Sequence, residues 1–327
     1  MTIGVIAPAS SARNVRDVDR AERGLKAAGF EVKMGRYVRD RHGFLASTDK
    51  NRLADLHTMF ADQSVDGIMC LRGGYGTSRI VADIDYDLVR ANPKVFIGFS
   101  DITMLGLAFL KRCSLVTFNG PMASSTFGNT HPSRFGISGF LRTVCHTSPA
   151  GSIWQEHDEQ SDRHYRVIRS GRASGQLVGG NLSLLAASIG TPFEMETASR
   201  IVFIEEVDEK PYAIDRMLTQ ILAAGKLRDA AGIVIGRNVP HTGFAKLEKR
   251  MAAKAPRQVK ALPAQMPRSQ EPVIDDVFYE RLRDLQIPVM TGLPFGHIHD
   301  YATLPLGVMA TMSTRNGDLV ITEAAVS

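Results

Sequence analysis

Short apolar runs alternate with longer amphipathic runs along the first 145 residues, and this alternation constrains the fold more than any other feature. The apolar runs are bounded by glycine, proline or polar residues, as buried parallel strands tend to be. The expected strands are residues 3–7, 31–34, 67–70, 95–98 and 115–118. The expected helices are residues 15–28, 52–63 and 102–110. Strands and helices in this order predict an open, parallel α/β sheet with helices on both faces.

The pattern changes after about residue 145, where a second domain is expected to begin. A chain of 327 residues is long enough for two domains of about 150 residues each. We divide it into an N-terminal α/β domain at 1–147, a polar linker region at 148–170 and a C-terminal domain at 171–327. Few helices and several short strands predict a β-rich, α+β C-terminal domain.

The elements expected in this second part are less regular. They comprise strands at 201–205, 232–236, 287–291, 307–312 and 319–322, helices at 182–189 and 213–223, and a glycine-rich turn at 178–181. Residues 241–271 match no clear pattern and are expected to hold a helix between loops.

The apolar run at the N-terminus is too short for a secretory leader, and no basic residue precedes it. No stretch approaches the roughly 20 apolar residues that a membrane span needs. A cytoplasmic location is therefore expected. Cys70, Cys113 and Cys145 are widely spaced, odd in number and set among apolar residues, so we expect buried thiols and neither disulfides nor zinc ligands.

The formal charge of +5 raises the question of a nucleic-acid partner. Basic and acidic residues are mixed along most of the chain, and only residues 246–260 are strongly basic, which is typical of a solvated helix face. No aromatic residues are interleaved with basic ones in the way that stacks bases. We expect no nucleic-acid or membrane partner, and the charge also suits an anionic small substrate.

Ser100 stands where a strand is expected to turn into a helix, in the segment GFSDIT. In such a turn the hydroxyl is lifted clear of the sheet edge, and the following helix offers unpaired N–H groups to an oxyanion. These features suit a nucleophile, although Ile102 replaces the second glycine of the usual elbow pattern. The alternative is a plain helix N-cap, a position at which serine is favoured.

Three glycines in the segment RGGYGT at 72–77 allow its backbone to approach a ligand closely. The segment lacks the lysine of a phosphate-binding loop, so a nucleotide site is not indicated. A tight turn is one interpretation. In a serine hydrolase, such a loop also donates an oxyanion N–H.

Glu205 ends an apolar strand, in which both faces are apolar and burial is expected. A buried carboxylate needs a partner, and a catalytic histidine would provide one. An acidic surface loop is the alternative, because four of the five residues 205–209 are acids. His297 and His299 lie in a loop bounded by glycine and proline. With Asp300 they could begin a metal site, but no matching cluster stands elsewhere, and a general base fits His297 better.

Together these segments resemble the LD-carboxypeptidase family, which comprises muramoyltetrapeptide carboxypeptidases and the related microcin-immunity peptidases. The resemblance covers nearly the whole chain. The segments that carry it, in order, are RGGYGTSRI at 72–80, IGFSDIT at 97–103, GQLVGGNLSLLAASIGTPFE at 175–194, FIEEVDEKPYAIDRMLTQI at 203–221, GIVIGR at 232–237 and GLPFGHIHDYATLPLG at 292–307.

The resemblance implies Ser100 as nucleophile, His297 as general base and Glu205 as the residue that orients it. The oxyanion donors implied are the backbone N–H groups of Asp101 and of Gly73 or Gly74. His299 is left as a bystander or a substrate contact. No metal and no cofactor are implied.

The implied reaction is release of the terminal D-alanine from a murein tetrapeptide during peptidoglycan recycling, by a cytoplasmic homodimer. A self-immunity peptidase acting on a peptidyl-nucleotide or another amide antibiotic is the nearest alternative, and a non-catalytic binding protein is a third. The sequence departs from the family at Ala9, where serine is common, at Asn119, where histidine is common, and at 241–271, where no family pattern is found.

Overall fold

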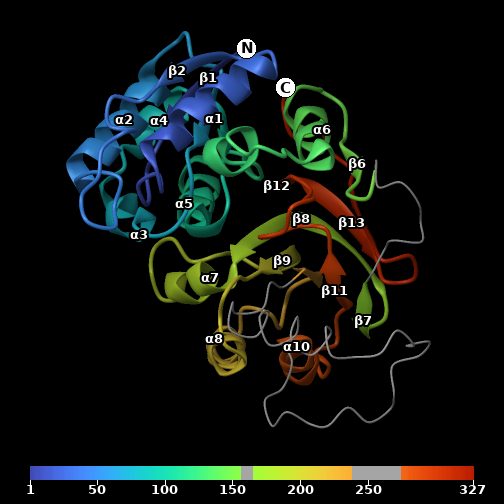
Figure 1. Cartoon of the computed structure of the whole chain (residues 1–327). Helices are drawn as coiled ribbons and strands as arrows, with labels where there is room; N and C mark the ends of the chain where they lie inside the picture. The colour runs from blue at the N-terminus through green and yellow to red at the C-terminus, as the bar shows by residue number, and fades with distance from the viewer. Residues whose placement is uncertain (156–164, 238–273) are drawn as a thin grey trace, which may run out of the picture.

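The computed structural model describes residues 1–155, 165–237 and 274–327, and all structural statements below concern these residues. Two sheets lie side by side with helices around them (Figure 1). The first sheet belongs mainly to the N-terminal half, and its strands are β1 (Thr2–Ile6), β2 (Glu31–Met34), β3 (Gly67–Cys70), β4 (Val95–Ile97) and β5 (Thr117–Asn119). The helices of this half are α1 (Val15–Ala27), α2 (Asp49–Ala61), α3 (Thr77–Ile80), α4 (Tyr86–Ala91), α5 (Thr103–Cys113) and α6 (Arg134–Val144). Short helical turns cover Val81–Asp83, Ser100–Ile102 and Ala123–Phe127.

The second half holds most strands of the other sheet. The strands that follow β5 along the chain are β6 (Gly151–Ser152), β7 (Arg166–Arg169), β8 (Arg172–Asn181), β9 (Ile201–Glu205), β10 (Gly232–Gly236), β11 (Val289–Leu293), β12 (Leu304–Leu306), β13 (Met309–Ser313) and β14 (Asp318–Ile321). All of them except β12 belong to the second sheet. The helices of this half are α7 (Leu182–Ser188), α8 (Pro211–Ala223) and α10 (Ile274–Leu282).

The first sheet has six strands in the order β12-β5-β4-β3-β1-β2, and all its neighbours are parallel except β12 against β5. The chain moves from β1 to β2 on one side and then crosses to β3 on the other. The strand order therefore reverses between β1 and β3, and open α/β sheets bind ligands at the carboxyl ends of the strands beside such a reversal.

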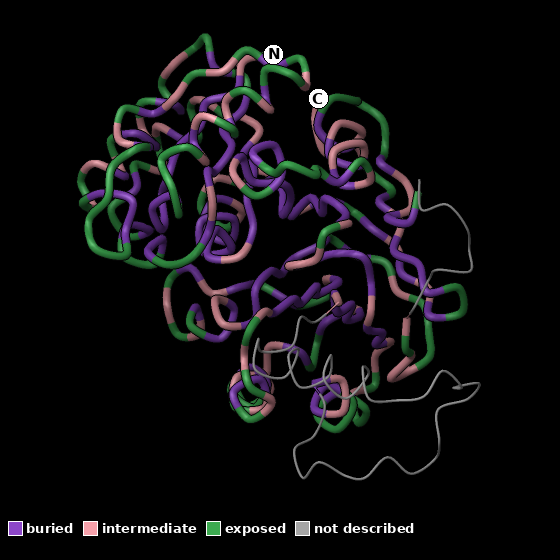
Figure 2. Tube along the Cα trace, in the orientation of Figure 1, coloured by how far each residue is buried: buried purple, intermediate pink, exposed green. Residues whose placement is uncertain are grey.

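Helices cover both faces of this sheet, as the alternation of apolar and amphipathic runs predicts. On one face, side chains of α1 and α6 such as Leu25 and Phe140 pack with β1 residues. On the other face, α2 and α5 contribute Phe60 and Phe109, which contact each other edge-on with ring centroids 5.5 Å apart. The buried positions follow the strands through the middle of the molecule (Figure 2).

The second sheet has eight strands in the order β6-β14-β13-β8-β9-β10-β11-β7. Strands β8 to β11 run parallel in its centre, and antiparallel strands flank them. Helices α7, α8 and α10 pack on one face, while Trp154, Phe203 and Phe295 belong to the core on the other. The predicted fold class, an open parallel α/β sheet followed by a β-rich α+β part, is confirmed.

Two expectations were wrong. Residues 178–181 are not a turn but the end of β8, where Gly179 has φ +150° and a side chain would meet the carbonyl oxygen of Phe203 at 1.9 Å. Glycine here permits close strand approach. Cys145 is exposed at the end of α6, and only Cys70 of the three cysteines is fully buried.

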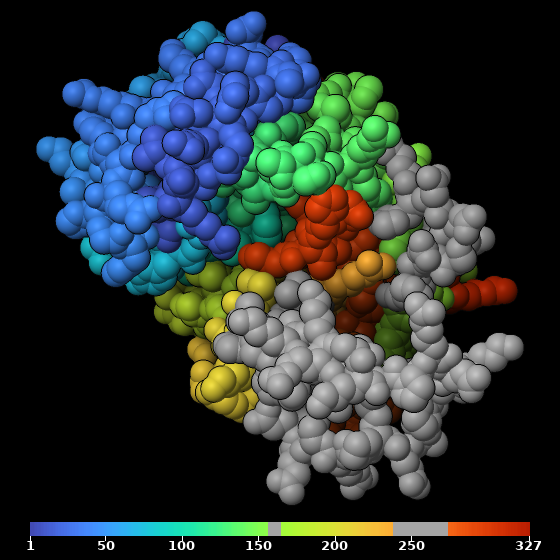
Figure 3. All heavy atoms as spheres, viewed as in Figure 1, coloured from blue at the N-terminus to red at the C-terminus, as the bar shows by residue number. Residues whose placement is uncertain are grey.

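The two halves are joined by more than a linker, because β12 from the C-terminal part pairs with β5 of the N-terminal sheet. Figure 3 shows C-terminal residues in red packed directly against green residues of the first half. The domain boundaries at 147 and 170 stay a prediction. Residues 241–271 and the basic run 246–260 lie outside the described residues. In the described parts of the chain, no helix has the length and apolar character required to cross a bilayer.

Candidate active site

Ser100 occupies a strained turn between β4 and α5. Its φ is +66°, a left-handed conformation that non-glycine residues adopt rarely and at a cost of about 1–3 kcal/mol. The preceding Gly98 makes the tight turn possible, because a side chain there would lie 2.9 Å from Ile102. A strained serine after a strand and before a helix is the geometry of a nucleophile elbow, reached here without the second glycine.

The hydroxyl of Ser100 lies 3.1 Å from Nε2 of His297 and does not cap the helix. On the other side of the ring, Nδ1 of His297 lies 2.6 Å from Oε2 of Glu205. A carboxylate at Nδ1 favours the tautomer that carries its proton there, which leaves Nε2 as the acceptor for the hydroxyl proton. The N-cap alternative for Ser100 is therefore wrong, and the three side chains form one continuous line of hydrogen bonds.

Glu205 is completely buried at the end of β9, so the alternative of an acidic surface loop is wrong for this residue. Its Oε1 accepts no hydrogen bond from the described residues, and the bond to His297 is the partner seen for the carboxylate. Gly296 has φ +103°, and a side chain there would approach Cβ of Glu205 at 3.0 Å. Glycine before His297 thus allows the loop that carries His297 and His299, which we call the histidine loop, to pass close to β9.

The environment of His297 acts on its protonation in two directions. Burial favours the neutral ring, but the hydrogen bond and charge of Glu205, with the charges of Glu206 and Asp208, outweigh burial and raise the pKa of His297. The ring also contacts Phe99 edge-on, with centroids 4.8 Å apart. Phe99 precedes Ser100 in the turn between β4 and α5, which we call the nucleophile turn because Ser100 is the expected nucleophile. This turn therefore also supplies the ring that packs against the imidazole and orients it.

Glu206 is a buried residue of the site for which the sequence suggested no role. It lies on the opposite face of β9 from Glu205 and accepts hydrogen bonds from Asn181 Nδ2 at 2.9 Å, Ser183 N at 2.9 Å and Ser183 Oγ at 2.7 Å. Burial raises the pKa of Glu206. These bonds tie the start of α7 to the end of β9, and thereby hold Glu205 in place. The alternation of side chains along the strand was the available signal, because it places Glu205 and Glu206 on different faces.

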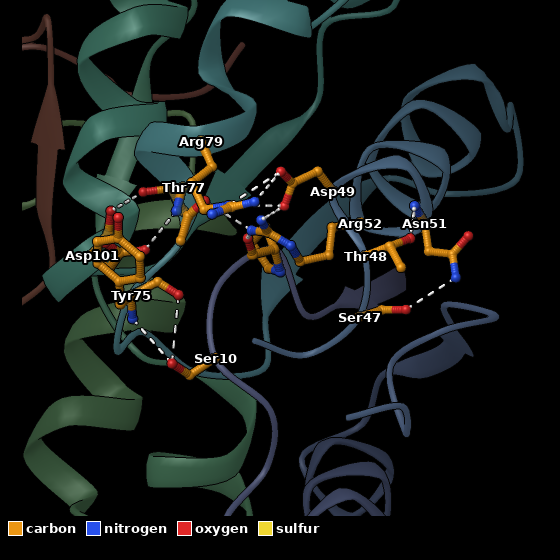
Figure 4. Close-up of polar contacts among 12 residues, drawn as sticks. Ser10, Ser47, Thr48, Asp49, Asn51, Arg52, Tyr75, Thr77, Arg79 and Asp101 are labelled. Atoms are coloured by element: carbon orange, nitrogen blue, oxygen red, sulfur yellow. Dashed lines mark hydrogen bonds and ion pairs between the residues drawn. The ribbon is translucent and has the colours of Figure 1, made fainter. Parts of the chain in front are cut away.

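Residues 73–76, which we call the glycine loop, lie against the nucleophile turn. A side chain at Gly73 would meet Cβ of Ser100 at 2.9 Å, and Gly74 has φ +110°. Only glycine allows this approach. Figure 4 shows the side chains around the loop: Ser10 Oγ accepts from Tyr75 N at 3.1 Å, and the guanidinium of buried Arg52 donates to the Gly76 carbonyl at 2.9 Å.

Asp101 locks the glycine loop to the nucleophile turn. Its buried carboxylate accepts from Thr77 N at 2.9 Å, and its carbonyl accepts from Thr77 Oγ1 at 2.6 Å (Figure 4). Burial raises the pKa of Asp101, opposed by the hydrogen bonds from Thr77 and Gly76. Because Asp101 follows Ser100 and Thr77 follows the glycine loop, this pair fixes the spacing of the two segments expected to donate to an oxyanion.

His299 lies in the same loop as His297 but contacts neither Ser100 nor Glu205. Its ring lies 2.9 Å from Asp300 Oδ1 and 2.9 Å from the carbonyl oxygen of His131, and its side chain is 57% exposed. Both partners accept hydrogen bonds from the ring and so favour its protonated form. The His131 carbonyl, followed by the Asp300 carboxylate, therefore raises the pKa of His299. His299 thus ties the histidine loop to the segment before α6. In the described ranges, no group of three or more His, Cys, Asp and Glu side chains is placed to hold a metal ion.

A serine, a histidine and a buried carboxylate bonded in sequence are the arrangement that serine hydrolases use. Comparison with protein families narrows the class. The LD-carboxypeptidase N-terminal domain matches residues 3–120, and the LD-carboxypeptidase C-terminal domain matches residues 174–312. The chain belongs to the LD-carboxypeptidase family and is a serine peptidase, which confirms the resemblance seen in its motifs.

Individual relatives agree. The chain is 39% identical to the probable murein peptide carboxypeptidase of Bacillus subtilis, over 100% of the chain and 92% of that protein. It superposes on the muramoyltetrapeptide carboxypeptidase of Oxalobacter formigenes with a TM-score of 0.77 and 28% identity, covering 99% of each chain. An MccF-like protein of Bacillus anthracis gives a TM-score of 0.79 and 27% identity, covering 98% of this chain and 96% of that one.

Proposed function

We propose that this chain is an LD-carboxypeptidase that removes the terminal D-alanine from murein tetrapeptide, with Ser100 as nucleophile, His297 as general base and Glu205 as the residue that orients it. One observation carries the proposal: Nε2 and Nδ1 of His297 lie 3.1 Å from Ser100 Oγ and 2.6 Å from Glu205 Oε2. This is the order of contacts that a hydroxyl nucleophile needs for activation.

In the proposed mechanism, His297 Nε2 takes the proton of Ser100 as Oγ attacks the scissile carbonyl carbon. The resulting oxyanion accepts hydrogen bonds from the backbone N–H of Asp101 and from that of Gly73 or Gly74. The imidazolium, stabilised by Glu205, gives its proton to the amine of the departing D-alanine. The tripeptide acyl group then stays on Ser100 as an ester.

Deacylation repeats these roles with water in place of the serine. His297 takes a proton from water as the water oxygen attacks the ester carbonyl, and then returns the proton to Ser100 Oγ. The tripeptide leaves as a free carboxylic acid. No metal or cofactor enters these steps, and Glu205 keeps its hydrogen bond to Nδ1 of His297 throughout.

The printed names of two relatives, a murein peptide carboxypeptidase and a muramoyltetrapeptide carboxypeptidase, support this substrate. From the same resemblance we propose a role in peptidoglycan recycling, a cytoplasmic location and a homodimer. Small-angle scattering or light scattering on the purified chain measures the last of these directly.

A self-immunity peptidase for a peptidyl-nucleotide substrate is the other candidate, favoured by the likeness to an MccF-like protein. Such an enzyme needs an aromatic platform for the base. Trp154, the single tryptophan of the chain, is 1% exposed, and its indole N–H donates to the Gly317 carbonyl at 2.8 Å. It therefore belongs to the core of the second sheet and does not provide such a platform.

Mass spectrometry of L-Ala-γ-D-Glu-diaminopimelate-D-Ala incubated with the enzyme tests the proposal. We expect loss of one alanine, and no loss with Ser100→Ala. No loss with the unaltered enzyme would contradict the substrate. Equal loss from enzyme and variant would contradict the nucleophile.

A further inference from the structure

Arg72 lies at the carboxyl ends of the strands where the order of the first sheet reverses. It follows β3, and the loop after β1 (residues 7–13) is its neighbour across the reversal. The two loops are in contact, since Ser10 N donates to the Gly73 carbonyl at 3.4 Å. Ligands of open α/β sheets bind in this position, and the proposed mechanism gives no role to any side chain there.

The guanidinium of Arg72 lies beside Gly74 of the glycine loop and contacts the loop after β1. Its Nη1 donates to the Ser11 carbonyl at 3.0 Å, and its Nη2 lies 3.5 Å from the place where a Gly74 side chain would begin. Gly73, one residue before, lies against Ser100. The half-buried guanidinium thus contacts the glycine loop at Gly74, next to the residue that lies against Ser100. Within the described parts of the chain, its other N–H groups make no hydrogen bond.

Two further arginines add positive charge at the same place. Arg41 Nη2 donates to the Ala12 carbonyl at 2.8 Å, one residue beyond the Arg72 contact, and Arg13 belongs to the same loop. Burial, and then the charges of Arg13 and Arg41, lower the pKa of Arg72, although an arginine stays protonated in water near neutrality. Helix α1 also begins in this region, directly after Asn14, so the positive end of its dipole lies here.

The nearby negative charge, on Asp17, already has other hydrogen-bond partners. Asp17 is the acid that acts on Arg72, and its carboxylate accepts from Arg20 Nη2 at 2.6 Å and from Asn14 N at 3.1 Å. Arg72 and Arg41 are held by backbone carbonyls and, like Arg13, make no ion pair with a carboxylate among the described residues, so the three concentrate positive charge. Such a site attracts an anion, and arginine binds a carboxylate through two parallel hydrogen bonds.

We propose that Arg72, in the field of Arg13 and Arg41, binds the free terminal carboxylate of the substrate and thereby makes the enzyme a carboxypeptidase. The inference rests on the proposed function, because it names how the same site selects its substrate. A terminal carboxylate lies three bonds from the scissile carbonyl carbon, within about 4 Å, so its binding group must stand beside the oxyanion donors. Arg72 adjoins the glycine loop at its first residue.

Calorimetric titration in a Ser100→Ala background separates this binding from catalysis. The two ligands are the murein tetrapeptide and the same peptide with a C-terminal amide. We expect the acid to bind at least about 10-fold more tightly than the amide, the range of a charge-assisted hydrogen bond. Adding Arg72→Gln should remove this preference, and adding Arg72→Lys should restore part of it.

A matched control is Arg23→Gln, which removes one positive charge from the exposed side of α1, where Arg23 Nε bonds the Asp19 carbonyl. It should leave the acid-to-amide ratio unchanged. The inference is overturned if Arg72→Gln preserves the ratio, or if neither ligand binds to the Ser100→Ala protein. Cleavage of the tetrapeptide by the unaltered enzyme tests the proposed function separately, so the two can fail independently.

Discussion

The Nε2 atom of His297 lies 3.1 Å from the Oγ of Ser100, although 197 positions separate the two residues in the sequence. Ser100 stands beyond the carboxyl end of β4, a central strand of the first sheet, and His297 stands in a loop that follows β11 of the second. The contact therefore depends on how the two sheets are packed, and β12, which follows the histidine loop and pairs with β5, is one of the elements that join them. Substitutions that weaken the pairing of β12 with β5 should therefore lower activity even where each sheet stays folded.

The left-handed backbone of Ser100 predicts a conflict between stability and activity. Ser100→Gly removes both the hydroxyl and the strain of φ +66°, so it should be inactive and more stable than Ser100→Ala by about 1 kcal/mol or more. Urea denaturation of the two variants measures the difference. Equal free energies of unfolding would contradict strain at this residue.

The protonation of His297 predicts the acidic side of the pH profile. The ring must be neutral to accept the Ser100 proton, so kcat/KM should rise with pH through the pKa of His297, which is raised above its usual value of about 6.5. Glu205→Gln removes the charge that raises this pKa. The variant should therefore lose several powers of ten in kcat and shift its remaining acidic limb to lower pH. An unshifted or upward-shifted limb would argue against the Glu205–His297 pair.

The contact between Gly73 and Ser100 predicts that the glycine loop tolerates no side chain. Gly73→Ala places a Cβ atom 2.9 Å from Cβ of Ser100, which is closer than Cβ atoms approach other heavy atoms in folded proteins. The loop or Ser100 must therefore move. We expect a fall of about 100-fold or more in kcat/KM with the fold retained, since small misplacements of reacting groups have such effects.

Gly139→Ala is the matched control for that change. Gly139 lies inside α6, and the nearest atom to an added Cβ is Arg142 Nη2 at 3.9 Å. Alanine should leave kcat/KM unchanged and raise stability by about 0.5–1 kcal/mol. Thermal unfolding and steady-state kinetics of both variants provide the comparison, and normal activity in Gly73→Ala would contradict the close approach.

The hydrogen bonds between Thr77 and Asp101 predict an effect on the proposed oxyanion site. Thr77→Val keeps the shape of the side chain but removes the donor to the buried Asp101 carbonyl, at 2.6 Å in the structure. We expect kcat to fall about 5- to 30-fold, with Thr77→Ser close to the unaltered enzyme. Steady-state kinetics would contradict the account if both variants lost activity equally.

Sequence alone could predict the fold class, and it also singled out the three residues that the structure brings together, but for different reasons. Strand lengths and apolar periodicity are local properties, so β1, β3 and β9 were expected close to where they lie. Ser100 and Glu205 each had a simpler local explanation, a helix N-cap and an acidic surface loop, whereas His297 already suited a general base better than a metal site. The order of six family motifs along the chain then favoured catalytic roles for all three.

The supporting contacts could not be predicted, because they join distant positions. Arg52 holds the Gly76 carbonyl across 24 residues, and Glu206 holds Asn181 across 25. No periodicity encodes such pairs, since they depend on which loops the sheet topology brings together. The same reason explains the error at 178–181, where glycines that favour a turn locally serve a close strand contact with Phe203.

The most direct test of the central claim is to locate the nucleophile chemically. The enzyme is treated with a fluorophosphonate, digested and examined by mass spectrometry, beside Ser100→Ala and His297→Ala. We predict one phosphonylated residue, Ser100, no adduct in Ser100→Ala, and labelling at least about 100-fold slower in His297→Ala, because the hydroxyl loses its base. An adduct on another serine, or none on Ser100 in the unaltered enzyme, would contradict the assignment of this site.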